Sequence, residues 1–144
     1  MKFLKRFLLM IQFLTSIPLP VNLDVDSEDF GKGLVFAPLV GLILGGLMAG
    51  FFHVTSIVFP VQVSAVFVIL LYVVLTGGLH LDGLMDTCDG LGVRGNLKKR
   101  LAVMKDSRVG AFGAQAAVLA MLVKTAAIAA LAQHDAYGAL LIIA

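Results

Sequence analysis

Long apolar runs dominate this sequence and restrict the folds open to it. They cover residues 33–59, 61–80 and 111–132, and residues 137–144 begin a fourth. A helix of about 18 or more apolar residues can cross the hydrocarbon core of a bilayer, which is about 30 Å thick. The chain is 60% hydrophobic and 14% charged, against about 45–50% and 25% in soluble domains. The sequence therefore predicts an all-α, polytopic membrane helical bundle, with residues 1–144 forming a single transmembrane domain.

The amino-terminal segment, residues 1–20, has a different pattern. Lys2, Lys5 and Arg6 precede a mostly apolar stretch. A signal peptide would continue into a cleavage site of small residues, whereas residues 17–20 read IPLP. Because proline ends a helix, we expect a retained amphipathic helix that lies at the membrane interface or dips into it.

The distribution of basic residues predicts which side of the membrane the polar loops face. Segment 82–108 contains six lysines and arginines, whereas the turns at Pro60 and at 134–135 contain none. Short loops rich in Lys and Arg stay in the cytoplasm, so 82–108 is expected on the cytoplasmic side. The polar loop at 24–32 lies two spans away along the chain and is expected on the same side.

Three aspartates follow the second apolar run directly, in the stretch HLDGLMDTCDGLG at residues 80–92. On a helix, Asp86 and Asp89 are rotated by only about 40° and 20° from Asp82, so the three form one stripe about 10 Å long. Like charges at these spacings repel each other. A divalent cation would offset the repulsion, and oxygen-only ligands suit Mg²⁺ or Mn²⁺. The stripe therefore predicts a cytoplasmic-side metal site; the alternative is a solvated acidic face paired with nearby basic residues.

Downstream, MKDSRVGAFG at residues 104–113 supplies a fourth acid, Asp106, between Lys105 and Arg108. Carboxylates that hold an ion and basic groups that hold phosphate oxygens occur together in sites for phosphorylated substrates. The candidates for substrate binding, basic or polar and expected on the cytoplasmic side, are Lys32, Arg94, Arg100, Lys105, Ser107 and Arg108. His80 joins them only if the chain is not helical at 77–78, because on a continuous helix it is rotated about 200° from Asp82.

Other features indicate a site less directly. A net charge of +2 provides no basic footprint for nucleic acid. Lys124 lies within an apolar run, where an ionisable residue is a functional hypothesis by default; an interhelical hydrogen bond or a partner acid explains it equally well. Small-xxx-small glycine pairs at 41/45 and 46/50 permit close helix packing, either within one chain or in a homo-oligomer.

Four stretches, FLTSIPLP, FAPLVGLILG, LTGGLHLDGLMDTCDGL and MKDSRVGAFG, occur here in an order and spacing that resemble the cobalamin (5′-phosphate) synthase family. The family is also called adenosylcobinamide-GDP ribazoletransferase. The resemblance implies an enzyme of the bacterial or archaeal inner membrane. Members of the family are substantially longer, so the resemblance also leads us to expect an amino-terminal portion that is incomplete at its carboxyl end.

The resemblance further implies a reaction. Adenosylcobinamide-GDP, a GDP-activated corrinoid, is joined to α-ribazole or its 5′-phosphate, GMP is released, and Mg²⁺ is required. Asp82, Asp86 and Asp89 would hold the metal, and Asp106 would be a further ligand or the general base for the attacking hydroxyl.

Two other functions remain open from the residues. The pattern Asp86, Asp89, Gly90 and Arg94 is similar to that of CDP-alcohol phosphotransferases, with one extra residue before the arginine, and would fit an enzyme of lipid synthesis. A cation or corrinoid carrier would use the stripe as an ion relay, although carriers place their binding sites near the middle of the membrane.

Overall fold

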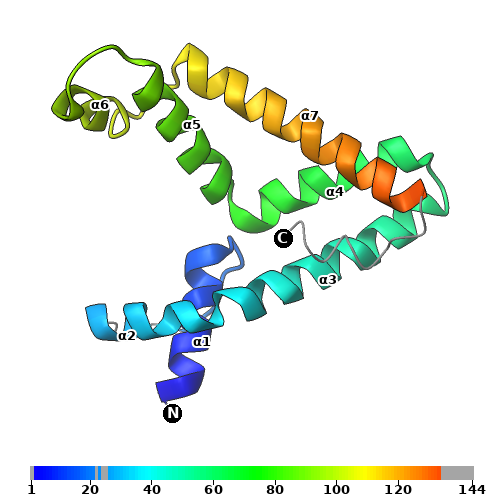
Figure 1. Cartoon of the computed structure of the whole chain (residues 1–144). Coiled ribbons are helices and arrows are strands. Elements are labelled where there is room, and N and C mark those ends of the chain that lie inside the picture. Colours follow the sequence, from blue (N-terminus) through cyan, green and yellow to red (C-terminus); the bar gives the residue numbers. More distant parts are fainter. Residues whose placement is uncertain (1, 22, 24–25, 134–144) are drawn as a thin grey trace.

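The computed structural model describes residues 2–21, 23 and 26–133, and every element assigned within them is helical (Figure 1). In chain order these are α1 (Lys2–Leu14), α2 (Ser27–Gly33), a 3₁₀ turn (Leu34–Phe36), α3 (Ala37–Ser56), α4 (Val61–Thr76), α5 (Leu79–Gly92), α6 (Leu97–Val103) and α7 (Ala111–Gln133).

Two helical stretches, Ser27–Ser56 and Ala111–Gln133, are long and apolar enough to cross a membrane. The bent pair α4 and α5 makes a third if the two are taken as one span. The predicted all-α architecture, with helices that suit a membrane, is therefore confirmed for the described residues. The turn at 134–135 and the apolar segment at 137–144 lie outside them.

Helix α1 lies across α2 and the start of α3 (Figure 1). Its basic residues are not all free for lipid headgroups, because Lys5 Nζ lies 2.6 Å from one carboxylate oxygen of Asp29 and Arg6 Nε 3.0 Å from the other. Met10 is fully buried against Phe36 and its neighbours on α3. These contacts attach α1 to the helical bundle, while its position at a membrane interface stays a prediction.

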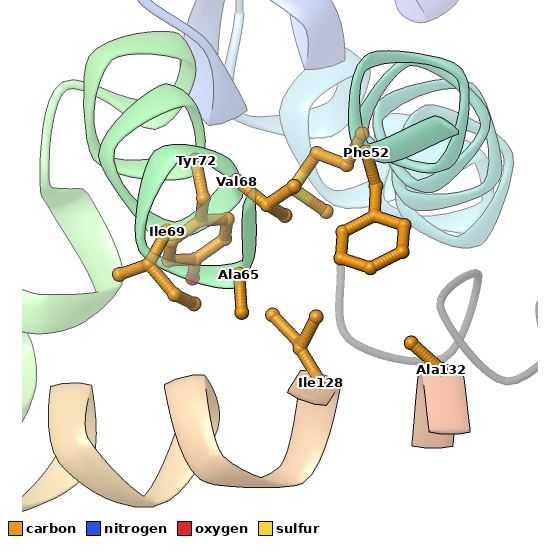
Figure 2. Packing of buried hydrophobic residues seen from close by; sticks show 8 residues of the cluster. Phe52, Ala65, Val68, Ile69, Tyr72, Ile128 and Ala132 are labelled. Atoms are coloured by element: carbon orange, nitrogen blue, oxygen red, sulfur yellow. The ribbon is translucent and has the colours of Figure 1, made fainter. Parts of the chain in front are cut away.

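Helices α3, α4 and α7 share the larger apolar core (Figure 2). Phe52 of α3 is fully buried, and Ala65 and Tyr72 of α4 face Ile128 of α7 across the same cluster. The turn between α3 and α4 includes Pro60, whose carbonyl accepts the first hydrogen bonds of α4. This core holds the carboxyl half of α7 against α4.

The apolar run at 61–80 contains a sharp break. Helix α4 ends at Thr76, and α5 leaves it at an angle of 89°. Gly77 and Gly78 have φ values of 60° and 75°, in the left-handed region that glycine adopts without a steric penalty. The bend directs α5 along the amino-terminal half of α7, which closes the open side of the bent pair (Figure 1). The aspartate stripe therefore lies on a separate helix, beyond the apolar run.

The segment that follows α1 is hydrogen-bonded to the end of α4, next to this bend. Ser16 donates from its backbone N–H to the carbonyl of Leu75, 2.7 Å away. Its hydroxyl contacts the carbonyls of Val74 and Leu75. Carbonyls in the last turn of a helix have no partner within the helix, so Ser16 completes the end of α4 and brings the chain after α1 against the bend.

Candidate active site

A cavity of about 270 Å³ lies between α5 and the segment that joins α6 to α7. From α5 it is lined by Asp82, Met85, Asp86 and Asp89, and from the joining segment by residues 104–109. The structure thus brings the aspartate stripe together with Lys105, Asp106, Ser107 and Arg108, which the sequence placed in one candidate site. Their chemical roles stay predictions.

Asp89 connects α5 to the start of α7. Its two carboxylate oxygens accept the backbone N–H groups of Gly110 and Gly113, each at 2.8 Å. The first N–H groups of a helix lack partners within the helix, and a carboxylate at this end also interacts favourably with the helix dipole. Asp89 is only 9% exposed, so it acts as a buried cap on α7.

Glycines make this junction possible. A Cβ atom at Gly110 or Gly113 would collide with the Asp89 carboxylate, and one at Gly113 would also lie 2.9 Å from the Met85 carbonyl. A Cβ atom at Gly90 would lie 2.6 Å from the Met104 side chain. The glycines of the DGLG and VGAFG stretches therefore allow close packing between α5 and the segments that line the cavity with it.

Asp106 and Arg108 form an ion pair at the rim of the cavity. The guanidinium Nη2 lies 2.7 Å from one carboxylate oxygen, and the backbone N–H of Arg108 donates to the other at 3.1 Å. These hydrogen bonds from Arg108 lower the pKa of Asp106 from its ordinary value of 3.8 to about 2. The pair orients a largely exposed arginine and keeps the carboxylate ionised.

This pair leads to a prediction about pH in protein freed of divalent cations. Because the pKa is lowered, the pair contributes fully above pH 3.8 and is lost as the pH falls through about 2. Replacing Arg108 by glutamine should return the pKa of Asp106 towards 3.8. Carboxyl ¹³C chemical shifts of labelled aspartate, followed against pH, measure this; a pKa that stays low in Arg108→Gln would contradict the assigned cause.

The donor atoms of the cavity suit a hard cation, because Asp82, Asp86 and Asp106 offer only carboxylate oxygens. Within the described residues, however, no three His, Cys, Asp or Glu side chains are gathered to hold a metal ion. Magnesium is commonly bound by one or two carboxylates, with substrate phosphates and water completing its shell. The cavity is compatible with that mode, and a complete protein cage is not preformed.

Four of the predicted substrate-binding residues lie elsewhere. Lys32 forms an ion pair with Glu28 on α2. Arg94 is exposed beyond the end of α5, and Arg100 lies on α6. None of these three side chains is among the residues that line the cavity.

His80 also lies outside the cavity. The chain does break at 77–78, but α5 already begins at Leu79, so His80 and Asp82 share one helix and face different sides. His80 lines a separate small cavity with Tyr72 and Lys124. Lys124 Nζ lies over the Tyr72 ring, 4.2 Å from its centre, so this lysine makes a cation–π contact with the tyrosine.

The sequence did not reveal the residues that hold Asp89 in place. Gly110 and Gly113 stand just before and within the first turn of α7, and they were noticed only as part of a motif. The first N–H groups of any helix lack partners within it, and glycines there leave room for a carboxylate, so this pattern could have suggested a cap. Met85, Met104 and Val109 also line the cavity, but no feature of the sequence distinguished them from core residues.

Comparisons with known proteins agree on one family. Residues 6–144 match the family described as cobalamin-5-phosphate synthase. A protein from Acetivibrio thermocellus named adenosylcobinamide-GDP ribazoletransferase is 52% identical over 110 residues, which is 76% of this chain and 44% of the relative. A relative of the same name from Clostridium tetani is 42% identical over 143 residues, which is 99% of this chain and 57% of the relative. The chain thus spans about half the length of these relatives. No solved structure matches it.

Proposed function

The chain belongs to the cobalamin-5-phosphate synthase family, and on this premise we propose that the whole protein is an adenosylcobinamide-GDP ribazoletransferase. It joins adenosylcobinamide-GDP to α-ribazole or α-ribazole 5′-phosphate and releases GMP. The hydroxyl oxygen of the acceptor forms a bond to phosphorus, the bond from that phosphorus to the bridging oxygen breaks, and the released proton passes to a carboxylate of the cavity.

The structural observation that supports this proposal is the composition of the cavity beside α5. The cavity beside α5 places carboxylates and basic side chains around one space, with Asp82 and Asp86 on α5 and Lys105 on the joining segment. A diphosphate needs cationic donors for its non-bridging oxygens, and in-line displacement at phosphorus needs its developing charge stabilised. A cavity that offers both kinds of group suits phosphoryl transfer.

The chain's own residues have distinct tasks in this proposal. Lys105 and Arg108 bind non-bridging oxygens of the diphosphate. Asp106 positions Arg108 through the hydrogen bonds that it accepts from the guanidinium. Asp89 positions the start of α7 against α5 and so maintains the shape of the cavity.

A magnesium ion is part of the proposal. Asp82 and Asp86 would hold it, with Asp106 as a further candidate, and the bound ion would neutralise charge on the phosphate oxygens. The absence of a preformed cage in the described residues agrees with an ion that arrives with the diphosphate. Manganese, which accepts similar oxygen ligands, is expected to substitute for it.

We propose that the reaction takes place on the cytoplasmic side of the cell membrane. The cavity lies within the segment 82–108 and its continuation, which holds six Lys and Arg residues, and loops of this kind stay in the cytoplasm. Cysteine accessibility at Lys98→Cys and Ile57→Cys tests the orientation. With the native Cys88 replaced by serine, a reagent that cannot cross the membrane should label Lys98→Cys only in inside-out vesicles and Ile57→Cys only in right-side-out vesicles. The reverse pattern would contradict the orientation.

The activity itself is tested with the full-length protein in lipid nanodiscs. We expect GMP release that requires adenosylcobinamide-GDP, α-ribazole and Mg²⁺ together, followed by chromatography with the cobalamin product as a second readout. Turnover of CDP-diacylglycerol in place of the corrinoid would contradict the proposal in favour of a lipid enzyme. Corrinoid flux into proteoliposomes without nucleotide turnover would contradict it in favour of a carrier.

A further inference from the structure

A second cavity adjoins the first, at the bend between α4 and α5. Its volume is about 480 Å³, and its lining includes Phe13, Thr15, Ser16, Thr76, Leu79 and Asp82. We propose that this second cavity binds the acceptor substrate, an aromatic nucleoside whose hydroxyl attacks phosphorus in the first cavity. The inference rests on the proposed function and adds to it the place of one of its two substrates.

The two cavities adjoin each other along α5. Asp82 and Met85 line both of them. A molecule in the second cavity can therefore reach Asp82, which also lines the first. Two reactants must be held next to each other with their reacting atoms in contact for the barrier to fall. Asp82, at the junction, is the carboxylate that can accept a hydrogen bond from the attacking hydroxyl.

The polar groups of the second cavity select a ligand that donates hydrogen bonds. Thr15 and Thr76 already donate their hydroxyl protons to the carbonyls of Ile11 and Tyr72, at 2.7 and 2.9 Å. Ser16 likewise donates to the carbonyl of Leu75 at 3.2 Å. Because a hydroxyl has one proton and two lone pairs, these side chains can now only accept. The carboxylate of Asp82 also accepts, so the side chains suit the hydroxyl groups of a sugar.

The remaining walls are apolar. Phe13, Leu79, Leu81 and Met85 present a ring and aliphatic surface to the same space. No lysine or arginine is among the described residues that line it, so the cavity has no cationic side chain for a diphosphate. An aromatic base attached to a sugar satisfies both kinds of wall, and the volume lies within the range of about 300–1,000 Å³ typical of small-molecule sites.

The fold holds this cavity in shape through contacts that are independent of the aspartates. The left-handed glycines at 77–78 make the bend, and Ser16 ties the chain after α1 to the last carbonyls of α4. Phe13 packs edge-to-face on Phe30, with ring centres 4.9 Å apart. Because Phe13, Thr15 and Ser16 are among the lining residues, the amino-terminal segment takes a direct part in acceptor binding.

A pair of substitutions on α5 tests the inference in the full-length protein. Leu79 lines the second cavity and is 39% exposed, whereas Leu84 is 37% exposed and lines neither this cavity nor the first. Leu79→Trp should raise the KM for α-ribazole by about tenfold, or about 1.4 kcal/mol, because the larger ring occupies space that the acceptor would fill. The KM for adenosylcobinamide-GDP should stay unchanged, and Leu84→Trp should change neither KM.

A second pair of substitutions, on α1, tests the same inference in case Leu79→Trp does not fold. Phe13→Leu removes the ring that faces the cavity, and Phe3→Leu removes a comparable ring of α1 that packs on Phe36 instead, with centres 4.5 Å apart. We expect Phe13→Leu to raise the KM for α-ribazole by about threefold to tenfold, from the loss of about 0.5–1.5 kcal/mol of ring contact. Phe3→Leu should leave it unchanged.

Direct binding separates this inference from the proposed function. Calorimetric titration of α-ribazole into nanodiscs should show binding to wild type that Leu79→Trp weakens and Leu84→Trp does not. If wild type binds in this way but releases no GMP, the proposed function fails and the acceptor site stands. If Leu79→Trp leaves α-ribazole binding and KM unchanged, or raises the KM of both substrates equally, the acceptor site is wrong even when GMP is released.

Discussion

Replacing Asp86 by asparagine should lower Mg²⁺-dependent GMP release by about 100-fold or more. Asparagine keeps the size of the side chain and removes its charge, and even second-shell changes around a bound metal commonly cost about 10–100-fold. Asp86 lines the cavity, whereas the bonds to the start of α7 are accepted by Asp89, so the substitution leaves that cap in place. The initial rate against Mg²⁺ concentration is the measurement, and the Mg²⁺ needed for half-maximal rate should rise as well.

The control for this substitution stands beside it. Thr87→Val is also close to isosteric and removes a polar group from the same turn of α5. Thr87 differs from Asp86 because it is exposed and does not line the cavity, and its hydroxyl donates to the carbonyl of Gly83. We expect Thr87→Val to retain its rate and both variants to insert into the membrane. An Asp86→Asn enzyme with a rate near that of wild type would refute the assignment of Asp86 to the metal.

Replacing Asp89 by alanine should destabilise the junction between α5 and α7 even without metal or substrate. The change leaves the N–H groups of Gly110 and Gly113 without their acceptors. Hydrogen bonds to a charged group contribute about 1.5–3 kcal/mol each, and loss of a helix cap costs about 0.5–2 kcal/mol. We therefore expect the free energy of unfolding to fall by about 2–4 kcal/mol, with faster hydrogen exchange at the first amides of α7.

A second aspartate on the same helix provides the comparison. Asp86→Ala removes a carboxylate from the stripe without removing a cap, and relief of repulsion between like charges should leave stability unchanged or slightly higher. If Asp89→Ala and Asp86→Ala have the same stability in metal-free buffer, Asp89 is not a structural cap. Faster exchange of the Gly110 and Gly113 amides in Asp89→Ala alone would identify the cap directly.

Helical phase explains why the position of the stripe could be predicted. Asp82, Asp86 and Asp89 lie within one helix, so their common face follows from 3.6 residues per turn. The same rule separated His80 from Asp82, and the structure places His80 with Tyr72 and Lys124. The all-α architecture was predictable for a related reason, because the length of an apolar run is a local property of the chain.

Contacts between distant residues could not be predicted in the same way. The bonds from Gly110 and Gly113 to Asp89 join residues 21 and 24 positions apart, and no periodicity relates such positions. Lys32 and Arg100 were expected on the same side of the membrane as the aspartates, yet neither lines the cavity. Charge and topology select a side of the membrane, while packing selects the few side chains that meet.

The sequence by itself determined a helical membrane chain, one aspartate stripe and the family to which the stripe's motif belongs, because these depend on run length, helical period and residue order. Only the tertiary structure decided that α5 turns away from α4 by 89° at two left-handed glycines. Only there does Asp89 become the cap of α7 and Ser16 the partner of the last carbonyls of α4. These features arise from contacts across the fold, whose free energy depends on neighbours that no local pattern specifies.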